Sequence, residues 1–263
     1  MPSRWTHKFK IKPDCWVFVP NAETYELGHE IKEAVNAVWR PPPYYAHLQK
    51  GGHIAALNSH LQSKHFIRAD IRQFFNHINR NRITRNLKNL FQSYSQAREV
   101  ANHSTVRNPA FSSGEYILPY GFVQSPIIAS LCLYKSALGK YLHSLKKSGF
   151  LVTVYMDDIL ISTDQSAEIL KQILANIHDK AAKSGFPLST QKTSSLPDIQ
   201  TVAFHIQIGP GISSIVPARL AKFALQIQQS TNPHQIGAIL RYVKQVNQDQ
   251  FEELFNLLAE TGS

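Results

Sequence analysis

The chain has 263 residues, of which 43% are hydrophobic, and a formal net charge of +10 at pH 7. This length suits one compact unit of two or three subdomains, and no apolar run approaches the roughly 20 residues of a membrane span. The start Met-Pro-Ser-Arg-Trp lacks the apolar core of a signal peptide. We therefore expect a cytoplasmic protein with no membrane partner, and the positive charge favours a polyanionic one.

Cysteine and histidine spacing gives no metal signature. Cys15 and Cys132 lie far apart, so they are predicted to be reduced and buried. The twelve histidines show no zinc pattern, and His53, His60 and His65 are predicted to be packing or surface residues.

The first part of the chain is predicted to contain an arm and a helix. Residues 1–20 carry aromatic residues among lysines and are expected to pack on the core as an N-terminal arm. Apolar residues at helical spacing predict a helix over residues 25–40. The three prolines 41–43 end this helix.

The middle of the chain alternates short strands with helices. Residues 66–71 are predicted to be a strand that delivers Asp70. A helix with Asn79 or Asn81 as its N-cap follows. Residues 93–114 are predicted to be a polar loop, and residues 125–147 one long helix.

Tyr155-Met156-Asp157-Asp158 is the most informative stretch. Apolar β-forming residues at 150–154 and 159–162 flank it, which predicts a β-hairpin with two carboxylates at its tip. Carboxylates among apolar strands need a cation or water. The alternative is an ordinary turn, in which Asp is common.

Helical patterns occupy most of the remaining chain. Asp164 and Gly185 are placed as the two caps of a helix that follows the hairpin. Beyond Pro217 the chain turns helical again, and Asn232-Pro233 is a good N-cap followed by proline at the first helical position.

Asp70 makes the acidic hairpin more than a turn. Two strands that each deliver an acid to one point can hold two Mg²⁺ ions, because hard cations prefer oxygen ligands. Two metals about 3.5–4 Å apart stabilise the attacking and leaving oxygens of a phosphoryl displacement. Asp70, Asp157 and Asp158 therefore predict a catalytic site with the chemistry of a polymerase.

The motifs resemble those of prokaryotic reverse transcriptases of the retron and group II intron kind, and most closely bacterial defence-associated (antiphage) reverse transcriptases. They follow the family's order over roughly residues 55–250. Order and spacing together make the resemblance specific. The five motifs are Asp70-Ile-Arg-Gln-Phe-Phe-Asn-His-Ile78, Leu118-Pro-Tyr-Gly-Phe-Val-Gln-Ser-Pro126, Tyr155-Met-Asp-Asp158, Ser184-Gly-Phe-Pro-Leu-Ser189 with Lys192, and the primer grip Phe204-His-Ile-Gln-Ile-Gly209.

The resemblance implies an α+β fold with a right-hand polymerase palm. The palm is an antiparallel sheet with helices on one face, next to reduced fingers and a short helical thumb. We assign residues 1–65 to the N-terminal arm and reduced fingers, 66–215 to the palm and 216–263 to the thumb.

The resemblance also implies roles for the acids and for Phe75. Asp70 and Asp157 would bind both Mg²⁺ ions, Asp158 would assist, and the backbone carbonyl of Ile71 would complete a metal shell. Phe75 would be the steric gate below the nucleotide sugar, selecting deoxynucleoside triphosphates. The alternative is a core phenylalanine, for which Phe74 is the better candidate.

Further nucleotide-binding residues come from the second and fourth motifs. Gly121 would let the backbone approach the substrate, and Gln124 with Ser125 would face the template–nucleotide pair. Tyr120 is either a nucleotide-binding residue or a buried structural one. Lys192 either approaches the triphosphate or lies on the surface.

The chain departs from the family in the fingers. Reverse transcriptases usually carry a basic hairpin that grips the triphosphate, and residues 44–62 offer only Lys50-Gly-Gly-His53 there. The typical arginine is missing, and whether Lys50 or Arg40 replaces it is open. This departure is the basis for predicting reduced fingers.

A basic cluster follows the first acidic motif. It comprises Arg80, Arg82, Arg85 and Lys88, with Arg82 and Arg85 near one helix face. The net charge favours nucleic-acid contact, and the alternative is a solvated surface.

The leading hypothesis is an RNA-directed DNA polymerase in antiphage defence. Its partners would be deoxynucleoside triphosphates, RNA and the DNA product. Whether the RNA is a structured noncoding RNA stays open, as does a further partner in the form of a second polymerase subunit or a second copy of the chain. One alternative is untemplated or protein-templated synthesis of simple-sequence DNA by the same site. Another is a catalytically idle RNA-binding scaffold, against which three converging carboxylates argue.

Overall fold

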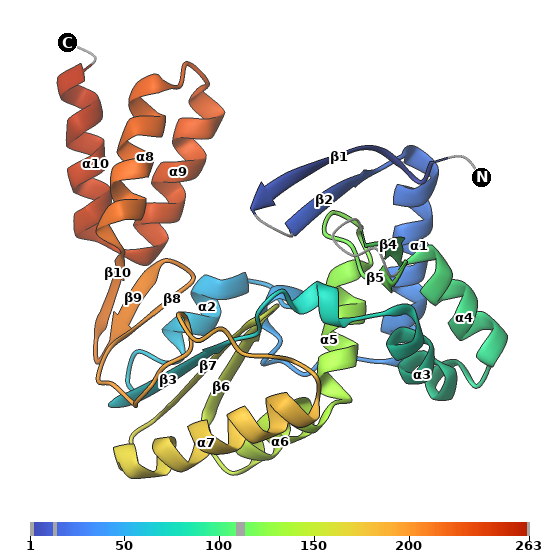
Figure 1. Cartoon of the computed structure of the whole chain (residues 1–263). Coiled ribbons are helices and arrows are strands. Elements are labelled where there is room, and N and C mark those ends of the chain that lie inside the picture. Colours follow the sequence, from blue (N-terminus) through green and yellow to red (C-terminus); the bar gives the residue numbers. More distant parts are fainter. Residues whose placement is uncertain (1–2, 13–14, 109–113, 262–263) are drawn as a thin grey trace.

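The computed structural model describes residues 3–12, 15–108 and 114–261. Figure 1 shows a central sheet with helices below it, a C-terminal helical bundle on one side, and an N-terminal hairpin with further helices on the other. No helix in the described part of the chain is long and apolar enough to span a membrane.

The central sheet has three antiparallel strands in the order β3-β7-β6. The predicted strand and acidic hairpin are both confirmed, since the strands are β3 His65–Asp70, β6 Leu151–Tyr155 and β7 Asp158–Thr163. Tyr155 pairs with Asp158, so Met156 and Asp157 form the connecting turn. Met156 has a φ of 58°, which puts its backbone in the left-handed region.

Period-two alternation divides the side chains of this sheet between two faces. One face is apolar and joins the main core, with Ile67, Ala69, Ile159 and Ile161 all buried there. Three helices supply most of the remaining core: α5 Ser125–Tyr134, α6 Ala137–Lys147 and α7 Ala167–Lys183. The opposite face carries Asp70, Asp158 and Arg68.

Two helices were expected to be one. Residues 125–147 break at Lys135–Ser136, where Ser136 accepts a hydrogen bond from the N–H of Gly139 at 3.1 Å and starts α6. A Cβ at Gly139 would lie 2.0 Å from the carbonyl oxygen of Leu133. The glycine therefore permits the tight bend that a continuous helix would not need.

The region after β3 contains more helix than predicted. It forms η2 Phe74–His77, α3 Arg80–Phe91 and α4 Tyr94–His103. Asn79 is the N-cap of α3, as one of the two predicted residues. The prediction of a loop over 93–114 is wrong for α4, because Ser93 caps a helix that buries Ala97, Val100 and Ala101.

Within residues 1–20, which were expected to be an arm, strands β1 Trp5–Lys12 and β2 Cys15–Pro20 pair antiparallel, and we call this pair the β1–β2 hairpin. Helix α1 Ala22–Val38 follows, close to the predicted 25–40, and then come η1 Ala46–Leu48 and α2 Gly52–Asn58. A small two-stranded sheet joins β4 Val106–Arg107 to β5 Tyr116–Ile117. In Figure 1 the hairpin extends from the side of α1 toward the C-terminal bundle.

The C-terminal part combines a small sheet with three helices. The strands are β8 Thr201–Ala203, β9 Ile206–Gly209 and β10 Ile212–Ile215. The helices are α8 Pro217–Gln229, α9 Pro233–Val246 and α10 Gln248–Thr261. Asn232 caps α9 as predicted, by accepting from the N–H of His234. This part shares a second core with Phe66 and Leu160 of the central sheet.

Candidate active site

Three carboxylates meet at one end of the central sheet. Asp70 and Asp158 are direct partners in the β3–β7 ladder, which places their side chains on the same face. The backbone N–H of Ile71 donates to the carbonyl oxygen of Asp157 at 2.9 Å. This bond ties the acidic turn to the end of β3, so the sheet itself brings the three acids together.

Two of the three acids have a cationic partner inside the protein. Lys192 Nζ donates to Asp70 Oδ2 at 2.9 Å, and Arg68 Nε donates to Asp158 Oδ1 at 2.9 Å. Asp157 makes no ion pair with any described residue. Lys192 thus lies at the acidic site with a carboxylate as its partner, and its approach to the triphosphate stays a prediction.

The electrostatics of the site favour a bound cation. Burial, followed by the charges of Asp158 and Asp70, raises the pKa of Asp157 from 3.8 to about 6. Burial also raises the pKa of Asp158, although the Arg68 guanidinium opposes this effect. A cation placed among these carboxylates would offset the free-energy cost of burying their charges and would reduce the repulsion between them.

The donor chemistry fits Mg²⁺, and the arrangement is not a ready-made metal cluster. Within the described ranges, no three Asp, Glu, His or Cys side chains already converge as a metal-binding group. Arg68 and Lys192 occupy two of the three acids instead. Asp70 and Asp157 offer the oxygen ligands that hard divalent ions prefer. The role of the Ile71 carbonyl in such a shell stays a prediction.

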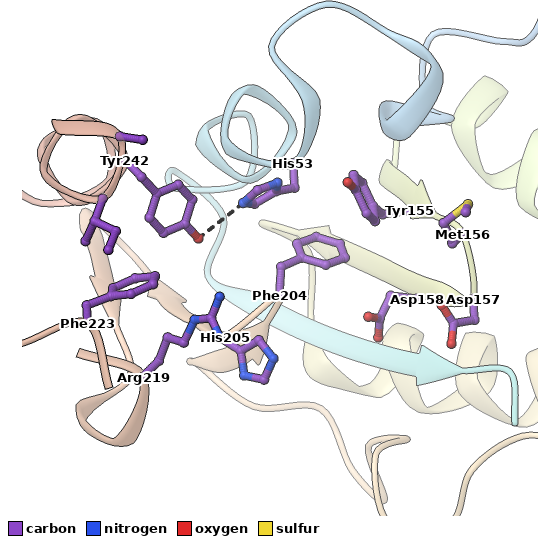
Figure 2. A pocket seen from close by; sticks show the side chains of 12 residues that line it. His53, Tyr155, Met156, Asp157, Asp158, Phe204, His205, Arg219, Phe223 and Tyr242 are labelled. Atoms are coloured by element: carbon purple, nitrogen blue, oxygen red, sulfur yellow. Dashed lines mark hydrogen bonds between the residues drawn. The ribbon is translucent and has the colours of Figure 1, made fainter. Parts of the chain in front are cut away.

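A cavity of about 540 Å³ lies between the acids and the C-terminal bundle. Figure 2 shows Asp157 and Asp158 at one end of it and Tyr242 and Arg219 at the other, with Phe204 between. His53 Nε2 and the Tyr242 hydroxyl are hydrogen-bonded at 3.3 Å, which links α2 to α9. The cavity therefore runs from the carboxylates of the β6–β7 turn to helices α8 and α9.

The turn between β8 and β9 forms part of this cavity wall. Phe204 and His205 both have left-handed backbones, with φ values of 56° and 64°. Such conformations are uncommon for non-glycine residues and cluster at functional sites. The ring of Phe204 lies 5.0 Å from that of Tyr155 between centroids. The fifth motif, expected to be the primer grip, is therefore next to the acidic hairpin.

Phe74 and Phe75 pack against different aromatic rings. Phe74 packs on Phe186 with ring centroids 5.4 Å apart, and Phe75 stacks on Tyr120 at 4.5 Å. Phe75 is only 3% exposed, because the Tyr120 ring covers it. Burial, and then the charges of Cys15 and Asp157, raise the pKa of Tyr120. Phe75 and Tyr120 thus border the acids, and the steric gate stays a prediction.

Gly121 has a structural reason to be glycine that the sequence did not reveal. Its φ is +100°, and a Cβ there would lie 2.3 Å from the carbonyl oxygen of Phe18. The Phe18 N–H also donates to the carbonyl of Tyr120 at 2.9 Å. The close approach at Gly121 is therefore to the backbone of β2, whereas we had expected a substrate.

The expectation for Gln124 and Ser125 requires a correction. Both residues are buried, with exposed fractions of 1% and 0%. A Cβ at Gly28 of α1 would lie 2.7 Å from Gln124 Oε1, so this side chain packs against α1. In this structure neither side chain is open to solvent, and Gln124 packs against α1.

The predicted basic cluster divides into two kinds of residue. Arg80 donates to Thr105 Oγ1 at 3.0 Å, with its guanidinium 3.7 Å from the centroid of the Tyr116 ring. Arg82 donates to the carbonyl of Ser184 at 2.7 Å. Arg85 and Lys88 are exposed. Nucleic-acid contact by this cluster stays a prediction, and two of its members already have structural partners.

The β1–β2 hairpin, and not residues 44–62, carries a group of exposed lysines. Residues 44–62 form η1 and α2, with Lys50 and Arg40 exposed near them. The β1–β2 hairpin instead carries exposed Lys8, Lys10 and Lys12. Lys8 and Lys10 lie 5.2 and 5.8 Å from the centroid of the Trp16 ring. The segment interpreted as an arm thus contains a basic hairpin.

Two residues at the site escaped the sequence analysis. Arg68 could have been found, because it precedes Asp70 by two residues and so shares its face of β3. His47 gave no such signal: its Nδ1 accepts the N–H of Met156 at 3.1 Å, across 109 positions of the chain. His47 Nε2 is hydrogen-bonded to Ser130 Oγ at 2.8 Å. His47 therefore holds the acidic turn against α5.

An acid-tipped β-hairpin beside a third acid, on a three-stranded sheet backed by helices, defines a template-copying polymerase palm. The model of the reverse transcriptase (RNA-dependent DNA polymerase) family matches residues 19–206, so the chain belongs to this family. The Gag-Pol polyprotein of Walleye dermal sarcoma virus is 31% identical over 134 residues, which are 48% of this chain and 7% of that protein.

Solved structures agree on the fold. The apo telomerase of Candida tropicalis, truncated from its C-terminal domain, has a TM-score of 0.52 at 14% identity, covering 73% of this chain and 45% of the other. Telomerase from Candida tropicalis in complex with a TWJ fragment of telomeric RNA has a TM-score of 0.52 at 15% identity, covering 88% and 47%. The chain thus spans less than half of these relatives, and the predicted α+β polymerase fold is confirmed.

Proposed function

We propose that this chain catalyses RNA-directed DNA synthesis by two-metal nucleotidyl transfer. The observation that carries the proposal is the junction of β3 with the β6–β7 hairpin, where Asp70, Asp157 and Asp158 meet. The pKa of Asp157 is raised to about 6 by burial and by the neighbouring acids, which supports a site where a bound cation would stabilise the carboxylates. Membership of the reverse transcriptase family supplies the reaction class.

The chain's own residues would divide the work as follows. Asp70 and Asp157 would hold two Mg²⁺ ions, which when bound would activate the primer hydroxyl and neutralise the pyrophosphate. Arg68 keeps Asp158 oriented and partly neutralised beside them. Lys192 would be free to turn toward the triphosphate once its present partner, Asp70, is otherwise occupied. His47 fixes the turn between the strands.

Substrate selection would involve the aromatic pair and the hairpin. Phe75 lies under Tyr120, which borders the acids, so a sugar entering there would meet a flat aromatic surface. Lys8, Lys10 and Lys12 would supply the basic grip on triphosphate or template that residues 44–62 lack. The bundle and the Phe204–His205 turn would flank the primer.

The finer assignment is a prokaryotic enzyme of antiphage defence. Its support is the motif resemblance. A structured RNA, a second polymerase subunit or self-association would complete the enzyme. Untemplated or protein-templated synthesis by the same acids is the second candidate. The buried, mutually repelling acids argue against a catalytically idle scaffold, because a scaffold gains nothing from them.

Nucleotide incorporation tests the proposal. The purified chain would be given Mg²⁺ and deoxynucleotides with primed RNA, with primed DNA, or with no template, before and after RNase treatment. We expect RNA-primed synthesis that Asp157→Asn abolishes and Lys171→Gln, an exposed control on α7, retains. Weak synthesis by the isolated chain that co-expressed genomic neighbours restore would support the partner assignment. Incorporation that Asp157→Asn leaves intact would overturn the assignment of the active site.

The defence role needs a cellular test. Cells carrying the chain with its genomic neighbours would be challenged with phages, and plaque formation would be compared with that of cells carrying Asp157→Asn. We expect protection by the wild type alone. Equal plaque numbers with both chains, under conditions in which synthesis is demonstrated, would reject a defence role and leave the polymerase assignment standing.

A further inference from the structure

A second cavity lies away from the catalytic acids, where α3, the α5–α6 bend and the end of α7 meet. It has a volume of about 240 Å³ and shares no lining residue with the cavity beside the acids. Figure 1 shows α3 and α5 on the side of the central sheet opposite the C-terminal bundle. Four basic residues line the cavity, namely Arg82, Arg85, Lys135 and Lys183.

The charges in this cavity are poorly balanced. None of the described residues that line it is acidic. Lys183 pairs with Asp179 at 2.9 Å, whereas Arg82, Arg85 and Lys135 make no ion pair with any described residue. Like charges that share a concave surface repel one another and attract anions. The described lining of this cavity therefore carries an excess of positive charge.

Arg82 is built into the wall in a fixed orientation. Its guanidinium lies 4.4 Å from the centroid of the Phe186 ring, and its Nη2 donates to the carbonyl of Ser184. Its other terminal nitrogen, Nη1, is buried without a hydrogen-bond partner. A buried donor of this kind normally has an acceptor. Its planar guanidinium also has the shape that suits a phosphate bound beside it.

A neighbouring cavity extends the surface beyond a single anion. It also measures about 240 Å³, and it shares Lys135 with the first cavity and adds Tyr134, Lys140 and His143. The rings of Tyr134 and His143 lie 5.8 Å apart at 82°. Basic residues interleaved with aromatic rings are typical of surfaces that bind phosphates together with bases or sugars. Exposed Lys88 and Lys140 add further positive charge nearby.

We propose that Arg82, Arg85, Lys135 and Lys183 form a phosphate-binding site for the phosphodiester backbone of a nucleic-acid strand, with the Tyr134–His143 cavity receiving an adjacent base or sugar. The site is separate from the polymerase centre and would anchor template or product outside it. RNA and DNA share this backbone chemistry, so the experiment contains one arm for each. The proposal does not depend on the polymerase reaction.

Binding without catalysis tests the site. Fluorescence anisotropy would follow a fluorescein-labelled single-stranded RNA, and separately the DNA of the same sequence, in EDTA over a range of salt concentrations. Arg85→Glu with Lys135→Glu would be compared with Lys64→Glu with Lys171→Glu, which makes the same charge change at exposed positions elsewhere. A second variant, Arg85→Gln with Lys135→Gln, removes the charges without adding new ones. It keeps the test decisive if the first variant does not fold.

We expect the cavity variants to bind at least about tenfold more weakly than the control. The slope of log affinity against log salt should become shallower by about 1–2, since each lost phosphate contact contributes about 0.7–0.9. A loss confined to RNA or to DNA would identify the strand and support the site. If both cavity variants bind both probes like the control pair, the site does not exist. Because binding is measured in EDTA without nucleotides, this result does not depend on whether the polymerase assignment holds.

Discussion

The central sheet has two faces of opposite character. The face toward α5, α6 and α7 is apolar, and Ile159 and Ile161 are fully buried in it. The other face carries Asp70 and Asp158, each held by a single cationic side chain. The first face gains free energy by excluding water, whereas the second keeps buried carboxylates whose pKa values are raised. The carboxylates are thus confined to one end of the second face, which further along contributes Phe66 and Leu160 to the second core.

The largest effect expected from this contrast concerns activity. Asp70→Asn or Asp157→Asn should lower DNA synthesis by at least about a hundredfold, because a lost metal ligand removes several kcal/mol of transition-state stabilisation. For Asp157→Asn the free energy of unfolding without metal should stay equal or rise, since a repelling charge is removed, whereas Asp70→Asn also loses the ion pair with Lys192. Primer extension and urea unfolding measure the two quantities. A variant that loses activity because it unfolds would erase the distinction between the faces.

The apolar side should show the reverse pattern. Phe74 is buried against Phe186, so Phe74→Ala should destabilise the fold by roughly 3–5 kcal/mol. Phe74→Leu, which keeps most of the volume, is the matched control and should cost much less. Urea unfolding measures both variants. A loss of synthesis by Phe74→Ala with unchanged stability would place this residue at the site instead of the core.

Acid should act on the polar face through His60. This side chain lies between Ser162 and Thr153, and burial followed by the charge of Lys146 lowers its pKa from 6.5 to about 4. Above pH 6.5 the free energy of unfolding does not depend on this proton, because His60 is neutral in both the folded and the unfolded chain. As pH falls from 6.5 toward 4 the unfolded chain binds the proton more readily, so stability declines by on the order of 2–3 kcal/mol.

Urea unfolding across this pH range would reveal the effect. In His60→Gln the decline should be shallower, although His47, whose pKa burial also lowers to about 4, titrates in the same window. An identical slope in wild type and His60→Gln would show that His60 is not the titrating group.

The smallest predicted effect is on sugar choice. Phe75→Val should raise the use of ribonucleotides relative to deoxynucleotides by about tenfold, the lower end of the range for removing part of an apolar contact. The relative kcat/KM for the two sugars measures it. Phe75 stacks on Tyr120, so some stability will be lost as well. If the fold weakens while sugar discrimination is untouched, Phe75 is a core residue and the gate assignment fails.

Local pattern predicted the apolar face well and the polar face only in part. Alternation fixed β3 and the acidic hairpin, and cap residues such as Asn79 and Asn232 marked helix starts. The bend at Ser136 was missed, because a tight helix–helix corner depends on the space around Gly139. The α4 helix was missed because its buried stripe consists largely of small residues.

At the site, the acids followed from sequence and their partners did not. Lys192 lies 122 positions from Asp70, and His47 lies 109 positions from Met156. Contacts at such separations depend on the complete fold, so no local spacing reveals them. The same limit explains Gln124, whose motif suggested a nucleotide contact while α1 covers it. The basic hairpin at β1–β2 was not predicted, because the family pattern placed such a hairpin at residues 44–62.

Metal-dependent stability tests the central claim most directly. Thermal unfolding of the wild type and of Asp157→Asn would be measured in EDTA and in increasing Mg²⁺, without nucleotide or nucleic acid. Ions that bind only the native acids should raise the wild-type Tm as Mg²⁺ increases. The variant should start at an equal or higher Tm and respond far less. Equal responses of both chains to Mg²⁺ would contradict the account, because the ions would then bind elsewhere than the acid-bearing face.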